Sequence, residues 1–106
     1  MYVQVTGTAE RPEVSVEEAD DCTRLHVSAG PLDEATVGTM LIRTGLGRPR
    51  GPGHVWLDIA ALRSRIRSHA PDWPQRFAAM IAHAGRNGWL DASGKLVAAH
   101  IAGNER

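Results

Sequence analysis

The stretch GLGRPRGPGH, residues 45–54, is rich in glycine and proline and separates two apolar segments of the chain. A phosphate-binding loop needs converging backbone N–H groups, usually followed by Lys-Ser or Lys-Thr. This stretch lacks that pair, and Pro49 and Pro52 have no N–H to donate. The sequence therefore predicts the end of a helix followed by a flexible joint, in which Arg48 and Arg50 offer side chains to an anion.

Before this joint, the first thirty residues alternate between apolar and polar side chains. The segments 2–6, 13–17 and 24–29 each show the period of two that is typical of half-buried strands. The breaks between them are short and contain turn-forming residues. These features predict a three-stranded antiparallel meander.

From residue 31 onward, the spacing of apolar residues favours helices. One helix is expected over 31–44, with Gly45 as a left-handed cap, and two more over 55–68 and 72–87. Trp56, Ile59, Leu62 and Ile66 would form the buried stripe of the second helix. Residues 89–101 read as a hairpin and 102–106 as a frayed tail. The fold class expected is α+β: an N-terminal three-stranded antiparallel sheet, three helices and a C-terminal hairpin or strand.

Composition indicates one small globular domain of 106 residues with a formal net charge of zero. The charge is unevenly distributed: residues 1–35 carry eight acidic and two basic side chains, and residues 36–106 carry four and ten. Acidic and basic faces that pair within the fold, or a basic binding face, would explain this split. The single cysteine and the absence of a signal-like or membrane-spanning stretch favour a cytoplasmic location.

The function that the sequence favours is a small non-enzymatic binding or regulatory domain that engages a protein or a small anionic ligand. A homodimer is one form it would take, since three tryptophans near one another offer partner-binding area. No cofactor, metal or membrane partner is expected. The ligand site is predicted on the 45–54 stretch and the arginine-bearing segment after it, at Arg48, Arg50, His54, Arg63 and Arg67.

A winged-helix DNA-binding protein is the first alternative, because two helices are followed by a hairpin. Its contacts would be Arg65, Gln75, Arg76, Arg86 and Lys95. The near-neutral charge argues against this hypothesis, and nucleic acid is not the favoured partner.

The second alternative is a small cofactor-free enzyme that uses a histidine and a carboxylate for acid–base chemistry. His26, His83 and Asp58 are the residues considered, and none is assigned as catalytic. The histidines lie too far apart in sequence to form a recognisable metal motif, and the acidic neighbours of Cys22 are unsuited to a reactive thiol.

Overall fold

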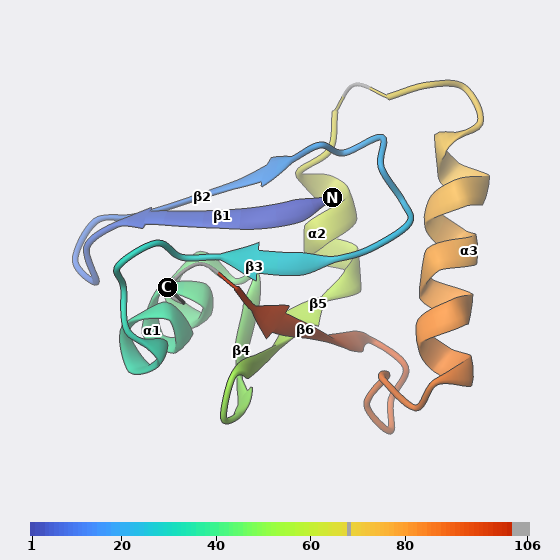
Figure 1. The fold of residues 1–106 in the computed structure, drawn as a ribbon. Helices are drawn as coiled ribbons and strands as arrows, with labels where there is room; N and C mark the ends of the chain where they lie inside the picture. Colours follow the sequence, from blue (N-terminus) through green and yellow to red (C-terminus); the bar gives the residue numbers. More distant parts are fainter. Residues whose placement is uncertain (68, 103–106) are drawn as a thin grey trace.

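The computed structural model describes residues 1–67 and 69–102. Its centre is one mixed, curled sheet of six strands in the order β2-β1-β3-β6-β5-β4 (Figure 1). The strands are β1 (Tyr2–Gly7), β2 (Pro12–Glu17), β3 (His26–Ser28), β4 (Gly47–Gly51), β5 (His54–Asp58) and β6 (Leu96–Ile101). Three helices accompany the sheet: α1 (Glu34–Thr44), α2 (Ile59–Ser64) and α3 (Trp73–Arg86). The small α+β domain has a radius of gyration of 13.0 Å.

The prediction of an N-terminal antiparallel meander is wrong for its third strand. β1 and β2 pair antiparallel, as expected, but β3 lies on the other side of β1 and runs parallel to it. A parallel neighbour needs a long crossover connection, and the chain from Gly7 to His26 supplies one by passing through β2 and the 18–25 loop. The sheet is therefore built from strands spread along the whole chain rather than from its first thirty residues.

The larger correction concerns residues 45–58, where the flexible joint and the start of a helix were predicted. This segment is a hairpin, in which β4 and β5 pair antiparallel from Gly47 opposite Leu57 to Gly51 opposite His54. Pro49 is tolerated because β4 is an edge strand, and Gly53 provides the left-handed turn at φ 76°. The predicted helix over 55–68 shrinks to the six residues of α2, and Ser68 lies outside the described residues.

The core lies on the inner face of the curled sheet. Alternate strand residues point into it, among them Val3, Val27, Val55, Leu57 and Ala99, and they join the buried residues of all three helices in one cluster. Helix α1 packs against both edge strands, β2 and β4, and so spans the opening of the sheet. Gly38 permits this approach, because a Cβ there would lie 2.6 Å from the Pro49 ring.

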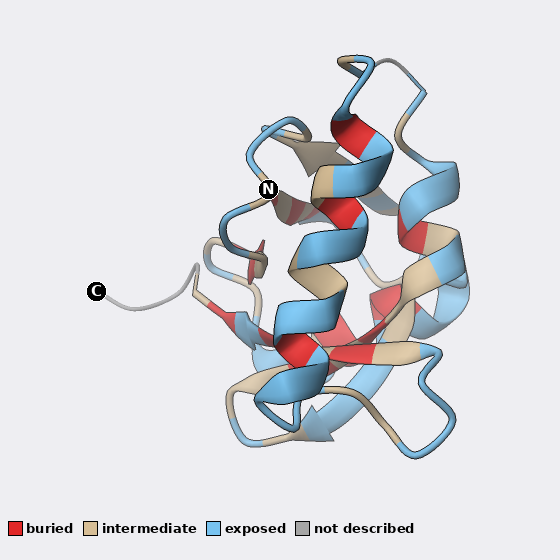
Figure 2. Cartoon of the chain, turned by 90° about the vertical axis from the view of Figure 1, so that its right-hand side faces the viewer, coloured by how far each residue is buried: buried red, intermediate tan, exposed pale blue. Residues whose placement is uncertain are grey.

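Helix α3 stands beside the sheet, at the right of the view in Figure 1. Viewed from that side, most of its surface is exposed and only isolated positions are buried (Figure 2). The buried positions are Trp73, Phe77 and Ala84, so the helical spacing expected over 72–87 is confirmed. The chain then turns at Gly88, and Leu90 forms a bridge with Val97 before β6 enters the middle of the sheet.

Residues 89–101 do turn back on themselves as a hairpin would, because the Ala98 amide donates to the Trp89 carbonyl oxygen at 2.8 Å, and β6 then lies between β3 and β5. Most of the tail predicted at 102–106 lies outside the described residues. Among the residues that are described, no helix combines the length and apolarity that crossing a membrane requires.

Asp58 ends β5 and begins α2, and its carboxylate accepts a hydrogen bond from the Ala61 amide at 2.9 Å. Loss of such an N-cap usually costs about 1 kcal/mol. We expect Asp58→Ala to lower the free energy of unfolding by about 1 kcal/mol in urea denaturation. Asp58→Asn keeps an acceptor at the cap and is expected to behave like the parent. Equal losses in the two variants would contradict the capping role.

Candidate functional site

A cleft of about 470 Å³ opens between α3, the 23–25 segment and the strands β5 and β6. Its polar lining comprises Thr23, Arg24, Arg50, His54, His83 and His100. Its apolar lining comprises Leu25, Met80, Ile81, Ala84, Trp89, Val97 and Ala98. A cleft of this size that joins an apolar wall to a few polar groups has the usual make-up of a small-molecule site.

The polar side of the cleft is cationic. Two arginines and three histidines line it, and none of the described lining residues is Asp or Glu. Within the part of the chain that the structure describes, both salt bridges belong to Arg76, so neither Arg24 nor Arg50 is paired with a carboxylate. The Arg50 guanidinium lies over the Trp56 ring at 4.9 Å, which holds it near the cleft. These guanidinium groups can donate hydrogen bonds to the oxygens of a carboxylate, sulfonate or phosphate.

The apolar side includes one of the most exposed aromatic rings of the protein. Trp89 keeps 47% of its surface exposed, and its ring meets His83 edge-on at a centroid distance of 5.8 Å. The three tryptophans thus differ: Trp73 is buried, Trp56 is half-buried and Trp89 is exposed. An exposed tryptophan at a cleft offers a large flat surface to an apolar or aromatic ligand group.

The register of the sheet places His54 and His100 next to each other. Tyr2, His26, His100 and His54 are successive partners across β1, β3, β6 and β5, so all four lie in one row on the outer face. The Tyr2 and His26 rings stack at 5.1 Å, and the His54 and His100 rings lie 5.7 Å apart. Burial lowers the pKa of His26, and the N-terminal ammonium, His100 and Arg24 lower it further, so His26 tends to stay neutral.

Hydrogen bonds engage one ring nitrogen each of His54 and His83. The Nδ1 atom of His54 lies 3.2 Å from the Pro52 carbonyl oxygen, which can only accept, so Nδ1 carries the proton. The side-chain nitrogen of Asn87 donates to the His83 carbonyl oxygen at 2.9 Å and lies 3.2 Å from His83 Nε2. His83 Nε2 is therefore placed to accept a hydrogen bond from the Asn87 side chain.

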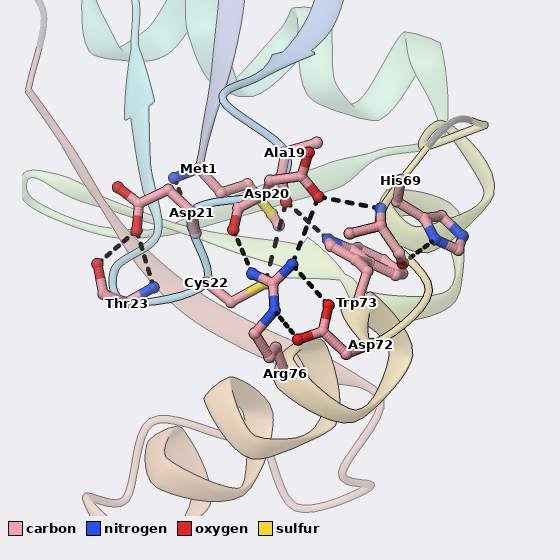
Figure 3. Close-up of polar contacts among 11 residues, drawn as sticks. Met1, Ala19, Asp20, Asp21, Cys22, Thr23, His69, Asp72, Trp73 and Arg76 are labelled. Atoms are coloured by element: carbon pink, nitrogen blue, oxygen red, sulfur yellow. Dashed lines mark hydrogen bonds and ion pairs between the residues drawn. The ribbon is translucent and has the colours of Figure 1, made fainter.

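The wall formed by residues 23–25 is held by contacts between the 19–23 loop and α3 (Figure 3). Trp73 Nε1 donates to the Ala19 carbonyl oxygen at 2.6 Å, and the Met1 ammonium donates to that of Asp21 at 2.8 Å. Arg76 donates to the Asp20 carbonyl oxygen and forms ion pairs with Asp20 and Asp72. Cys22 lies within this cluster, and partial burial raises the pKa of its thiol. These contacts join the first strands to the helix across the end of the sheet.

The structure brings two of the predicted ligand residues, Arg50 and His54, into the cleft. It does not bring the others there. Arg48 belongs to the same edge strand but does not line the cleft, and the Arg63 guanidinium lies over the Phe77 ring at 5.3 Å. Arg67 lines a separate polar hollow between β2 and α2, together with Arg65.

The residues predicted for DNA contact are dispersed. Arg65 donates to the Thr44 carbonyl oxygen at 3.4 Å, and Arg76 is engaged by Asp20 and Asp72. Gln75 and Arg86 are exposed on α3, and Lys95 lies in the turn before β6. Of the residues considered for acid–base chemistry, Asp58 caps α2 and only His83 lines the cleft.

The sequence did not indicate Arg24 or His100 as ligand-binding residues. The alternation of β6 places His100 on the outer face, but only the strand order shows that His54 is its neighbour. Trp89 is one of the three tryptophans that the sequence offers as binding area for a partner or ligand if exposed, and it is the one that the structure exposes at the cleft. No three His, Cys, Asp or Glu side chains within the described chain are grouped closely enough to hold a metal ion.

Comparisons with protein-family models, with curated proteins and with solved structures find no match to this chain.

Proposed function

We propose that the protein is a small binding domain that takes up an organic anion with an apolar part in the cleft between α3 and the sheet. One observation supports this above all: among the described residues, no carboxylate pairs with Arg24 or Arg50, and an exposed tryptophan lines the same cleft. The guanidinium groups would bind the anionic group, and Trp89 with its apolar neighbours would contact the rest of the ligand.

The finer features expected from the sequence accompany this proposal. They are a regulatory rather than catalytic role, a cytoplasmic location and a homodimeric form. Nucleic-acid binding and acid–base catalysis stay predictions, and no specific contact in the structure favours either of them over anion binding.

The first test uses 2-naphthalenesulfonate, an aromatic anion of about 14 non-hydrogen atoms, followed by amide-resolved NMR titration. A ligand of this size that binds with about −0.3 kcal/mol per atom has a dissociation constant of about 1 mM. Shifts are expected at residues 23–25, 80–84, 89 and 97–100. Uncharged 2-naphthol has the same ring system without the sulfonate and is expected to bind at least about threefold more weakly.

Two arginine variants provide a matched comparison on one strand. Arg50→Gln removes a charge from the cleft lining and is expected to weaken naphthalenesulfonate binding about three- to tenfold. Arg48→Gln removes the same charge two residues away, outside the lining, and is expected to change the affinity by less than about twofold. Equal effects of the two variants, or equal binding of the sulfonate and the naphthol, would contradict a specific anion site.

A further inference from the structure

His54 and His100 form a pair of neighbouring rings at the cleft. The two residues are directly opposite each other on β5 and β6, with ring centroids 5.7 Å apart, and both line the cleft. His100 is exposed and His54 is half-buried, so water and small ions reach both. Histidine ordinarily titrates near pH 6.5, so each ring can gain a proton within the physiological range.

The charges around the pair are mostly positive. Among the described residues, the charged and titratable groups that line the cleft or adjoin the pair are Arg50 on β4, His26 on β3 with Arg24 just before it, His83 on α3, and Glu34 on α1. The one acidic group among them, Glu34, accepts a hydrogen bond from the Gly53 amide at 2.9 Å. An anion bound here would lie beside two arginines and both rings of the pair.

We propose that anion binding in this cleft is coupled to proton uptake by His54 and His100, so that affinity rises as the pH falls. This inference rests on the proposed function. A bound anion would lie beside both rings, because His54 and His100 line the same cleft as Arg24 and Arg50. Its negative charge favours the protonated form of each ring, so the bound form takes up protons from water.

The hydrogen bonds of the rings indicate which nitrogen atoms would take up the added protons. His54 already donates from Nδ1 to the Pro52 carbonyl oxygen, so an added proton goes to Nε2 and creates a second donor. His83 differs, because its Nε2 accepts from the Asn87 side chain, and protonation there would break that hydrogen bond. The coupled protons are therefore assigned to His54 and His100 rather than to His83.

The experiment repeats the naphthalenesulfonate titration at several values between about pH 8 and about pH 5.5, a range that brackets the titration of histidine. The sulfonate stays fully ionised throughout, so any pH dependence belongs to the protein. Affinity is expected to rise about tenfold over this range, which corresponds to about one pKa unit of coupling. In parallel, NMR of the ring protons should show His54 and His100 titrating at higher pH when the probe is bound.

Variants separate this coupling from general charge effects. The double variant His54→Gln, His100→Gln is expected to bind the probe with nearly the same affinity at both ends of the range. In each single variant, the change in the logarithm of the affinity between the two ends of the range is expected to be about half of that in the parent protein. His69→Gln, at an exposed histidine outside the cleft, should retain the full dependence. Circular dichroism at each pH confirms that the compared proteins are folded.

The outcomes for the two proposals differ. Binding at about pH 8 with an affinity that stays flat on acidification overturns the coupling and leaves the proposed function standing. An unchanged slope in the double variant overturns the assignment to these two histidines. Failure of the probe to bind at any pH in the range overturns the proposed function and the coupling with it.

Discussion

Leu57→Ala is expected to lower the free energy of unfolding by about 2–5 kcal/mol, the usual cost of emptying a fully buried leucine site. Leu57 is the last residue but one of β5, points to the inner face and has 0% of its surface exposed. Its backbone partners are Gly47 on β4 and Val97 on β6, so the cavity would open between three strands. Urea denaturation followed by circular dichroism measures the loss.

Trp56→Ala is the matched comparison, because the helix predicted from the sequence and the strand in the structure assign opposite roles to these neighbours. In the helix, Trp56 belongs to the buried stripe and Leu57 does not. In the strand, Trp56 is half-buried on the outer face, under the Arg50 side chain. We expect Trp56→Ala to cost less than half as much as Leu57→Ala, although tryptophan is the larger residue. A greater loss for Trp56→Ala would contradict the strand.

The helices α1 and α3 could be predicted from the sequence because their signals are local. Gly45 does adopt the left-handed cap, at φ 74°, and the Leu46 amide donates back to the Leu41 carbonyl oxygen at 3.0 Å. Trp73, Phe77 and Ala84 recur with the spacing of one helix face. The first two strands were equally clear from alternation. Such patterns depend on neighbours a few residues away, and tertiary contacts did not override them.

The β4–β5 hairpin was missed because its alternation is masked. Val55, Trp56 and Leu57 are all apolar, so the segment looks continuous and continues into the apolar positions of α2. The prolines of 45–54 suggested a joint, although an edge strand accommodates proline on its unpaired side. The parallel pairing of β3 with β1 and β6 could not be predicted from local sequence patterns either, because the paired residues are more than twenty positions apart.

The same long-range pairing explains why the site was only half predicted. Arg50 and His54 were identified because the 45–54 stretch is visibly unusual. Arg24, Trp89 and His100 come from three other segments, and only the strand order places them beside that stretch. The arginines of 63–67 looked like a binding face while they were assigned to a long helix. Once α2 ends at Ser64, they no longer share a surface with the cleft.

Gly47→Ala is expected to destabilise the protein by about 2–3 kcal/mol, although it adds only one methyl group. A Cβ at Gly47 would collide with the Trp56 carbonyl oxygen and lie 3.3 Å from the Leu57 Cα. Both obstacles are backbone atoms of the paired strand, so no side-chain rotation can relieve the contact, and β4 must move away from β5. Because Arg50 is carried by β4 and His54 by β5, naphthalenesulfonate binding should weaken together with stability.

Gly85→Ala is the control, because the same methyl group meets different surroundings there. Gly85 is an exposed residue of α3, and its added Cβ would lie 3.3 Å from Cδ1 of Leu90, the movable end of a side chain. Replacing glycine by alanine inside a helix gains up to about 1 kcal/mol, so this variant is expected to match or exceed the parent in thermal stability. If Gly47→Ala were as stable as Gly85→Ala, β4 could not lie against β5 as described, and the cleft would lose the strand that positions Arg50.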